Sequence, residues 1–301
     1  MRTVYLGTSE FAAAVLERLA ASPHRPVLVV TRPDRPKGRG RRLESPPVAH
    51  AARALGLDVF QPDDVNDEVA GARIAAAAPD VVVVCAFGAL LKGPLLSAHD
   101  MLNVHPSLLP GWRGAAPIER AIMAGDAETG VAIMRVTAGV DSGPVCLVER
   151  EPIRADDDFG SLSARLAPLG AELLLRALDE SPPFAEQPED GVTYAEKISA
   201  VDRVLDPRTS SAAELERTVR ALSPHVGARL ALADEAFLGV WGAQLAGDAA
   251  SEPGTLGSEG GRLLLSCARA SALELTLVQP PGRRPMPAVD YLRGHPSGLT
   301  R

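Results

Sequence analysis

The stretch Val81-Val82-Val83-Val84-Cys85-Ala86 contains six apolar residues in a row. A strand with one solvent-exposed face alternates apolar and polar residues, whereas a central strand covered on both faces is apolar throughout. The stretch therefore predicts a central strand of a mostly parallel sheet that has helices on both faces.

Strand-like and helix-like stretches alternate on either side of this run. Residues 3–6 form an apolar strand-like segment, and residues 10–20 follow with apolar side chains on one helical face and a cap at Thr8 or Ser9. Other predicted strands are 27–30, 101–104, 131–136 and 145–148, and other predicted helices are 47–55, 65–77, 117–123 and 162–178. This alternation indicates a Rossmann-like α/β domain over residues 1–180.

The pattern changes after residue 180. Proline, glycine and acidic residues make 181–206 resemble a linker. One helix is then predicted at 211–222, followed by short strands at 228–232, 236–241, 262–266 and 272–278. Short strands separated by turn residues favour a small β-barrel or sandwich over 207–301.

Composition limits the function. The chain has 301 residues, with 31 Lys and Arg, 38 Asp and Glu, and a formal net charge of -7. A negative net charge argues against a general nucleic-acid binder. Three widely spaced cysteines support neither a disulfide framework nor a zinc site. Without a signal-peptide pattern or a membrane-length apolar run, a soluble cytoplasmic protein is expected.

Two polar residues stand close together at the predicted strand 101–104. Asn103 and His105 are two positions apart, so their side chains share one face of the strand. Pro106 cannot continue a central strand, which places His105 at the carboxyl end, where open α/β sheets bind ligands. A carboxamide beside an imidazole can donate hydrogen bonds to one oxygen, as acyl transfer requires.

Asp141 is the second candidate, in Gly139-Val140-Asp141-Ser142-Gly143. An aspartate between glycines is often only a turn former. The alternative is a carboxylate brought next to His105 from the end of the following strand, where it would keep the imidazole charged and relay a proton. Spacing alone leaves both interpretations open.

The stretch from Asn103 to Pro110, Asn-Val-His-Pro-Ser-Leu-Leu-Pro, resembles the signature of the folate-dependent formyltransferases, and Gly139–Gly143 resembles their acidic loop. Further similarities narrow the resemblance to the methionyl-tRNA formyltransferases: Arg32–Pro36, Gly38–Gly40, Trp112–Ile118, Gly125–Val131, Thr193–Ile198 and Gln279–Pro280. The resemblance covers nearly the whole chain and is looser beyond residue 207.

The resemblance implies transfer of a formyl group from 10-formyltetrahydrofolate to the α-amine of methionine on initiator tRNA, with no metal. It implies Asn103, His105 and Asp141 as the catalytic residues, the first two stabilising an oxyanion while Asp141 holds His105 charged. It also implies that the C-terminal domain, residues 207–301, is an OB-like barrel that helps to hold the tRNA, and that the protein is a monomer. The folate site would be formed by Ser107, Leu108, Leu109, Pro110, Phe87, Gly88, Val136 and Val140.

A basic segment follows the second strand. Six basic residues and one acidic residue within 32–42 give it a net charge of +5, so the remainder carries -12. Its prolines and glycines predict a loop without regular structure. The resemblance implies that this loop contacts the acceptor end of the tRNA through Arg35, Lys37, Arg39, Arg41 and Arg42.

Three other functions remain open at this stage. A nucleotide-sugar formyltransferase and a formyltetrahydrofolate hydrolase would use the same Asn, His and Asp residues with another amine or with water as the acceptor. An RNA-binding module without catalysis is the third. The Gly38–Gly40 stretch and the Thr193–Ile198 stretch disfavour the first two, and the three polar residues together disfavour the last.

Overall fold

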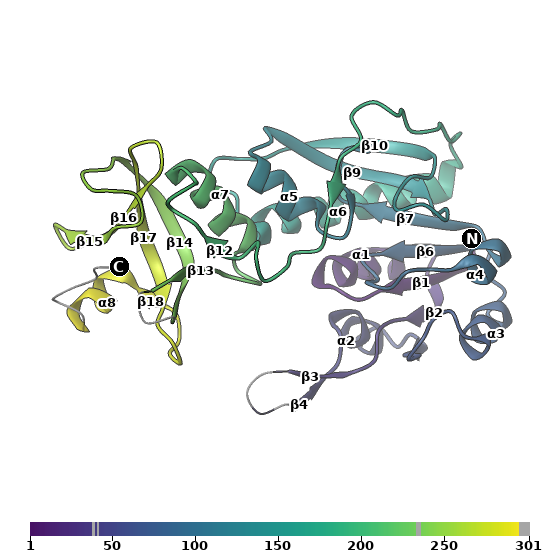
Figure 1. Ribbon diagram of the computed structural model, residues 1–301. Helices are drawn as coiled ribbons and strands as arrows, with labels where there is room; N and C mark the ends of the chain where they lie inside the picture. Colours follow the sequence, from purple (N-terminus) through teal and green to yellow (C-terminus); the bar gives the residue numbers. More distant parts are fainter. Residues whose placement is uncertain (38–39, 41, 233–235, 295–301) are drawn as a thin grey trace. The chain divides into compact units, whose positions relative to one another are not determined.

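The computed structural model describes residues 1–37, 40, 42–232 and 236–294. The chain divides into two compact units, and Figure 1 shows the elements of each. The first comprises Met1–Pro117, Glu128–Pro152 and Ser163–Glu196, and the second comprises Ile118–Ala127, Ile153–Leu162 and Lys197–Arg301. The division into residues 1–180, 181–206 and 207–301 stays a prediction.

The first unit is built on a seven-stranded sheet in the order β10-β9-β7-β6-β1-β2-β5. The five strands from β7 to β5 are parallel, and β9 is antiparallel to both β7 and β10. The all-valine run lies near the middle as β6, fully buried as expected. The strands are β1 (Thr3–Gly7), β2 (Pro26–Val30), β5 (Val59–Phe60), β6 (Val81–Cys85), β7 (Met101–His105), β9 (Glu128–Arg135) and β10 (Val145–Pro152).

Helices cover both faces of this sheet. Val4 and Leu6 of β1 pack in a cluster with Ile74 and Leu95, which come from helices on one face. On the other face, Tyr5 donates a hydrogen bond to the Ala12 carbonyl at 2.6 Å. Ser9 caps the helix that contains Ala12, as predicted. The helices of this unit are α1 (Glu10–Ala20), α2 (Pro47–Ala54), α3 (Glu68–Ala76), α4 (Gly93–Ala98) and most of α6 (Phe159–Glu180), whereas α5 (Pro117–Ala124) belongs to the second unit from Ile118 onward. The Rossmann-like architecture is confirmed.

The basic segment contains regular structure, contrary to the predicted loop. Arg35–Lys37 forms β3 and Arg42–Glu44 forms β4, and the two strands pair antiparallel in a sheet of their own. Figure 1 shows this hairpin extending from the strands of the first unit. Proline at position 36 is tolerated because an isolated two-stranded ribbon leaves one edge of each strand without a neighbour.

The second unit contains an antiparallel-rich sheet in the order β12-β13-β14-β17-β16-β15, with β18 also pairing to β17. Its strands are β12 (Val204–Leu205), β13 (Ala228–Ala231), β14 (Phe237–Asp248), β15 (Leu256–Glu259), β16 (Arg262–Cys267), β17 (Ser271–Gln279) and β18 (Met286–Pro287), and α8 (Ala288–Gly294) follows. Within the described residues β12 and β15 remain the edges. The expected OB-like barrel is therefore an open, barrel-like sheet.

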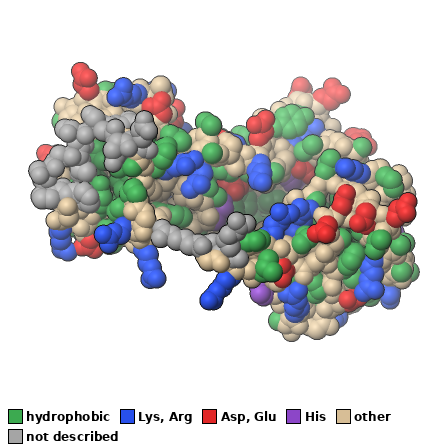
Figure 2. Space-filling view, turned by 60° about the horizontal axis from the view of Figure 1, so that its bottom comes forward, with side chains coloured by type: hydrophobic (Ala, Val, Ile, Leu, Met, Phe, Trp, Pro, Cys, Tyr) green, Lys and Arg blue, Asp and Glu red, His purple; other side chains and the backbone are tan. Residues whose placement is uncertain are grey.

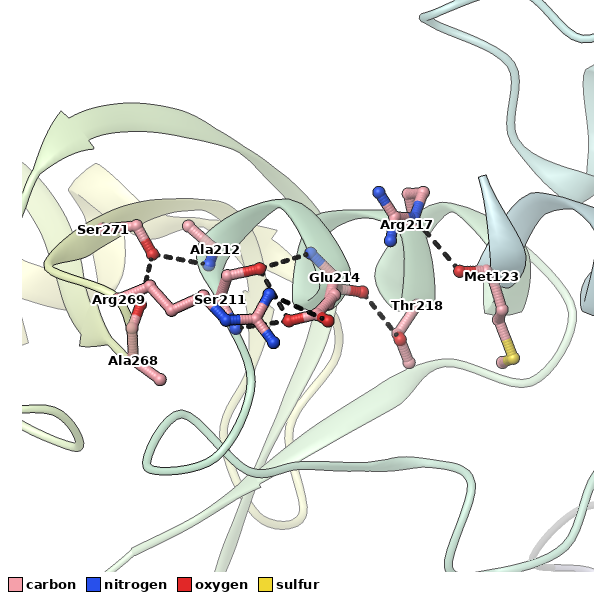
Figure 3. A network of polar contacts seen from close by, with 9 residues as sticks. All are labelled: Met123, Ser211, Ala212, Glu214, Arg217, Thr218, Ala268, Arg269 and Ser271. Atoms are coloured by element: carbon pink, nitrogen blue, oxygen red, sulfur yellow. Dashed lines mark hydrogen bonds and ion pairs between the residues drawn. The ribbon is translucent and has the colours of Figure 1, made fainter. Parts of the chain in front are cut away.

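Helix α7 (Ala212–Leu222) packs on this sheet, with Leu215, Val219 and Leu222 in the same cluster as the strand residues. Its start is strongly specified, because Ser211 and Glu214 form a reciprocal capping box. Figure 3 shows Arg269 reaching the Glu214 carboxylate, while Arg217 donates to the Met123 carbonyl. The helix is thereby joined to the sheet turn at 268–271 and to residues 118–127.

Among the described residues, no helix combines the length and hydropathy required of a membrane span.

Candidate active site

Asn103 and His105 lie on β7 and face the same way, as the strand spacing predicted. The strand ends at His105, directly before Pro106. His105 is 3% exposed, whereas Asn103 is half-buried. Both side chains contact one carboxylate: Nδ2 of Asn103 donates to Oδ1 of Asp141 at 3.1 Å, and Nδ1 of His105 lies 3.6 Å from Oδ2. The structure thus places the Asp141 carboxylate beside His105, while Asp141 also lies in a turn.

The path to Asp141 could not be predicted from the sequence. Strand β9 runs antiparallel to β7, so its last residue, Arg135, pairs with Leu102. The chain must then turn back to bring Asp141 to Asn103 and His105. Asp141 adopts a left-handed conformation at φ 42°, and its Oδ2 accepts a hydrogen bond from the Gly114 backbone at 2.9 Å. A non-glycine residue in that region carries local strain, which is common at functional sites.

A backbone carbonyl sets the orientation of the His105 ring. Nε2 of His105 lies 2.9 Å from the carbonyl oxygen of Trp112. A carbonyl can only accept, so Nε2 must carry a hydrogen, and Nδ1 is the nitrogen that faces Asp141. The backbone nitrogen of Trp112 in turn donates to Oγ1 of Thr193 at 2.8 Å. The ring is therefore held with Nδ1, the nitrogen that can gain or lose a proton, toward the carboxylate of Asp141.

Gln187 is a structural partner of the site that sequence reasoning missed. Its Nε2 donates to the carbonyls of Asp141 and Gly143 at 2.9 and 2.7 Å. Its Oε1 accepts from Nε and Nη2 of Arg113 at 3.0 and 2.7 Å. One side chain thus ties the loop that carries Asp141 to β8 (Arg113–Gly114), which pairs in parallel with β11 (Tyr194–Ala195).

The predicted folate loop continues from the strand that carries the two polar residues. Ser107 is fully buried, and its Oγ donates to the Gly111 carbonyl at 2.6 Å. Leu108, Leu109 and Pro110 form the half-buried turn between them, with a cis bond before Pro110. A Cβ on Gly130 of β9 would lie 2.5 Å from Cδ2 of Leu108, so glycine there leaves room for the loop.

The remaining predicted folate residues belong to two loops. Phe87 is buried after β6, and its carbonyl accepts a hydrogen bond from Thr8, while Gly88 beside it is exposed with φ 73°. Val136 follows β9 and packs on the same cluster as Phe87, whereas Val140 is 53% exposed. Phe87 and Val136 thus pack on one cluster, and Val140 precedes Asp141 in the chain.

The predicted tRNA contacts lie on the hairpin or outside the described residues. Arg35 and Arg42 are exposed on β3 and β4, and Lys37 pairs with Arg42 through the backbone register. Arg39 and Arg41 fall outside the described residues. On the face drawn in Figure 2, basic and acidic side chains are interspersed, and neither forms one continuous patch.

Metal and thiol chemistry find no support in the described part of the chain. No group of three or more His, Cys, Asp and Glu residues there could hold a metal ion. Burial raises the pKa of Cys85 to about 12 and that of Cys267 to about 11, so both thiols stay protonated near neutral pH.

The amino-acid sequence matches family models and known proteins over nearly its whole length. Residues 1–178 match the formyl transferase family model, and residues 197–296 match the model of its C-terminal domain. A methionyl-tRNA formyltransferase from Halorhodospira halophila is 44% identical over 97% of this chain and 96% of the relative. One from Dechloromonas aromatica is 42% identical over 98% and 96%.

Two solved structures share the fold. An N-formyltransferase from Helicobacter canadensis, in complex with folinic acid and dTDP-3-aminofucose, matches with a TM-score of 0.66, 14% identity, and coverage of 91% of this chain and 98% of that one. HypX from Aquifex aeolicus in complex with tetrahydrofolic acid gives 0.63 at 17% identity, covering 99% of this chain, which spans about half of HypX. From its two family domains and its full-length relatives, the chain belongs to the methionyl-tRNA formyltransferase family.

Proposed function

We propose that this chain transfers the formyl group of 10-formyltetrahydrofolate to the α-amine of methionine on initiator tRNA. The observation that carries the proposal is a pair of donors and a carboxylate, Asn103, His105 and Asp141, gathered in a chain whose full-length relatives are methionyl-tRNA formyltransferases. The two solved folate complexes of the same fold support a folate donor.

The polar atoms of the site fit a formyl group. Asn103 has two amide hydrogens, and only one is used within the described residues, on Asp141. The other hydrogen is available to a substrate oxygen. The folate supplies the transferable formyl carbon, and no metal ligand set is present among the described residues.

The roles of the three side chains follow from their contacts. As the methionine amine adds to the formyl carbon, the formyl oxygen gains negative charge, which Asn103 Nδ2–H stabilises by a hydrogen bond. A protonated His105 stabilises it through its positive charge, since the Trp112 carbonyl and Asp141 face its two ring nitrogens. Asp141 Oδ2, 3.6 Å from Nδ1, compensates the positive charge of the ring. The amine loses a proton and the departing folate nitrogen gains one, and His105 with Asp141 carries that proton between them.

The basic hairpin is proposed to bind the acceptor end of the tRNA. Arg35, Lys37, Arg39, Arg41 and Arg42 supply the positive charge, which suits phosphate contacts and stacking on unpaired bases. Because the rest of the chain carries a net charge of -12, the attraction of tRNA is local to this segment.

We also propose that the protein is a monomer and acts in the cytoplasm.

One assay tests the proposal. The full chain is incubated with 10-formyltetrahydrofolate labelled in the formyl carbon and with initiator Met-tRNA, while elongator Met-tRNA serves as the control. Label is expected on initiator Met-tRNA alone. Transfer to a nucleotide-sugar amine, or release of formate with water as the acceptor, in place of transfer to tRNA would assign one of the other functions.

A further inference from the structure

A pocket of about 190 Å³ lies in the second unit, where β13 meets β14 and the turn after β17. Arg203, Arg229, Phe237, Trp241, Gln279 and the turn at 280–282 line it. For scale, an engineered cavity of about 150 Å³ holds benzene. The pocket is open to solvent, so it can take a phosphate while an adjoining ring lies partly against its wall.

The two arginines in the pocket differ from other arginines of the unit in their partners among the described residues. Arg203 donates to the carbonyls of Gly227 and Val226, and Arg229 donates to the carbonyl of Ala200. Within the described residues neither has a carboxylate in ion-pair distance. By contrast, three other arginines of this unit pair with glutamates: Arg220 with Glu216, Arg262 with Glu274 and Arg269 with Glu214.

The charges of Arg203 and Arg229 are incompletely compensated. Nε of Arg229 is buried and has no hydrogen-bond partner in the described structure. Burial and the charge of Arg229 lower the pKa of Arg203. A buried donor without a partner, next to a second cation, is costly unless an anion supplies the missing acceptors.

The wall beside these cations is aromatic and held in place. The guanidinium carbon of Arg229 lies 4.8 Å from the centre of the Phe237 ring. Nε1 of Trp241 donates to Oε1 of Gln279 at 2.9 Å, and Nε2 of Gln279 donates to the Arg283 carbonyl. A Cβ on Gly227 would lie 2.7 Å from the Trp241 ring, so glycine lets the indole approach the backbone.

We propose that this pocket binds one nucleotide unit of RNA, with the phosphate held by Arg203 and Arg229 and the base or ribose packed against Trp241 and Phe237. Cations beside aromatic rings are the combination that binds single-stranded nucleic acid. Which RNA is bound rests on the function proposed above. The bound phosphate supplies the acceptor that Nε of Arg229 lacks.

The test measures equilibrium binding of uncharged initiator tRNA to the full chain across a salt series. The variant Arg229→Gln is compared with Arg269→Gln, which removes the same charge from an exposed arginine already paired with Glu214 (Figure 3). Arg229→Gln is expected to raise Kd by about fivefold or more and to reduce the slope of log K against log salt by about 0.7. Arg269→Gln is expected to leave Kd within about twofold.

Arg229→Lys covers the case in which the glutamine variant folds poorly. It keeps the charge and is expected to keep the salt slope while Kd rises by about threefold. Equal tRNA binding by wild type and a folded Arg229→Gln would overturn the proposal. If adenosine monophosphate binds wild type, Arg229→Gln abolishes that binding and tRNA affinity stays unchanged, the site takes a free nucleotide and the RNA assignment is wrong.

The binding assay needs no formyl transfer, so the two proposals fail separately. If wild type transfers no formyl group but Arg229→Gln weakens tRNA binding, the proposed function is wrong and the pocket assignment stands. If wild type formylates initiator Met-tRNA and the two glutamine variants bind tRNA equally, only the pocket assignment is wrong.

Discussion

Nδ2 of Asn103 lies 3.1 Å from Oδ1 of Asp141, although 38 positions separate the two residues in the chain. This bond uses one amide hydrogen of Asn103 and directs one oxygen of Asp141 away from His105. The other oxygen faces Nδ1 of His105 and accepts from the Gly114 backbone. Each of the three side chains is thus held by another, and altering one is expected to disturb the group.

Removal of either donor is expected to slow formyl transfer strongly. Asn103→Ala and His105→Ala should each lower kcat/KM by about 10²-fold or more, the effect of losing an oxyanion donor. Steady-state kinetics with initiator Met-tRNA measure the loss. His99→Ala, at a loop histidine after α4, is the control and should retain activity. Near-normal kinetics in a folded Asn103 or His105 variant would reject the catalytic role.

Gln187 is expected to act on the rate through the position of Asp141. Gln187→Ala removes the bonds to the Asp141 and Gly143 carbonyls, so kcat should fall about tenfold or more while KM for folate changes less. The exposed neighbour Glu186 provides the control, Glu186→Ala. A loss of thermal stability with unchanged kcat would make Gln187 a purely structural residue.

The hairpin arginines are expected to affect tRNA and not folate. Arg39→Ala and Arg42→Ala should each raise KM for initiator Met-tRNA by about threefold to tenfold and leave KM for 10-formyltetrahydrofolate unchanged, because the segment supplies the local positive charge. Arg73→Ala, at an exposed α3 arginine paired with Asp58, controls for the change in net charge. A variant that loses folate affinity instead contradicts the assignment.

Asp202 is expected to make stability depend on pH. Its hydrogen bonds from Arg120, then from Ser199, lower its pKa from 3.8 to about 2. A pKa lowered from 3.8 to about 2 corresponds to a stabilisation of at most about 2.4 kcal/mol. Because the folded pKa is the lower one, this contribution is complete above about pH 5, is lost as the pH falls toward 2, and is roughly halved by pH 3.

The measurement for Asp202 compares denaturant unfolding of wild type and Asp202→Asn. The variant should be less stable by about 1–2 kcal/mol at pH 7, and the gap should narrow at pH 3. Asp100→Asn, at a residue with 76% side-chain exposure, should show no such narrowing. A gap that stays constant with pH would show that the Arg120–Asp202 pair contributes through packing alone.

The sequence predicts those parts of the fold that repeat a pattern. The run at β6 and the apolar face of α1 were predicted correctly, because burial on two faces or on one face imposes a composition. The β3–β4 hairpin was not predicted, since its Pro and Gly residues normally indicate a loop. Strand β14 extends to Asp248, beyond the predicted end at residue 241. Its later part was not predicted, because glycine and polar residues there interrupt the apolar pattern.

The candidate site also has parts that the sequence predicts and parts that it does not. Asn103 and His105 share a face because two-residue spacing is a local rule, and the sequence predicts it. The Trp112 carbonyl and the Gly114 nitrogen are backbone atoms, which leave no signal in residue identity. Gln187 lies in a stretch that resembles a linker, and only the return of the chain past β10 brings it to Asp141.

The β3–β4 hairpin has an evolutionary consequence. Among the described residues its strands pair only with each other, so the seven strands of the first unit keep their order and register independently of it. Insertions or substitutions between positions 37 and 42 therefore leave the positions of Asn103, His105 and Asp141 unchanged. The sequence of this segment can therefore change in evolution while the three polar residues of the site stay in place.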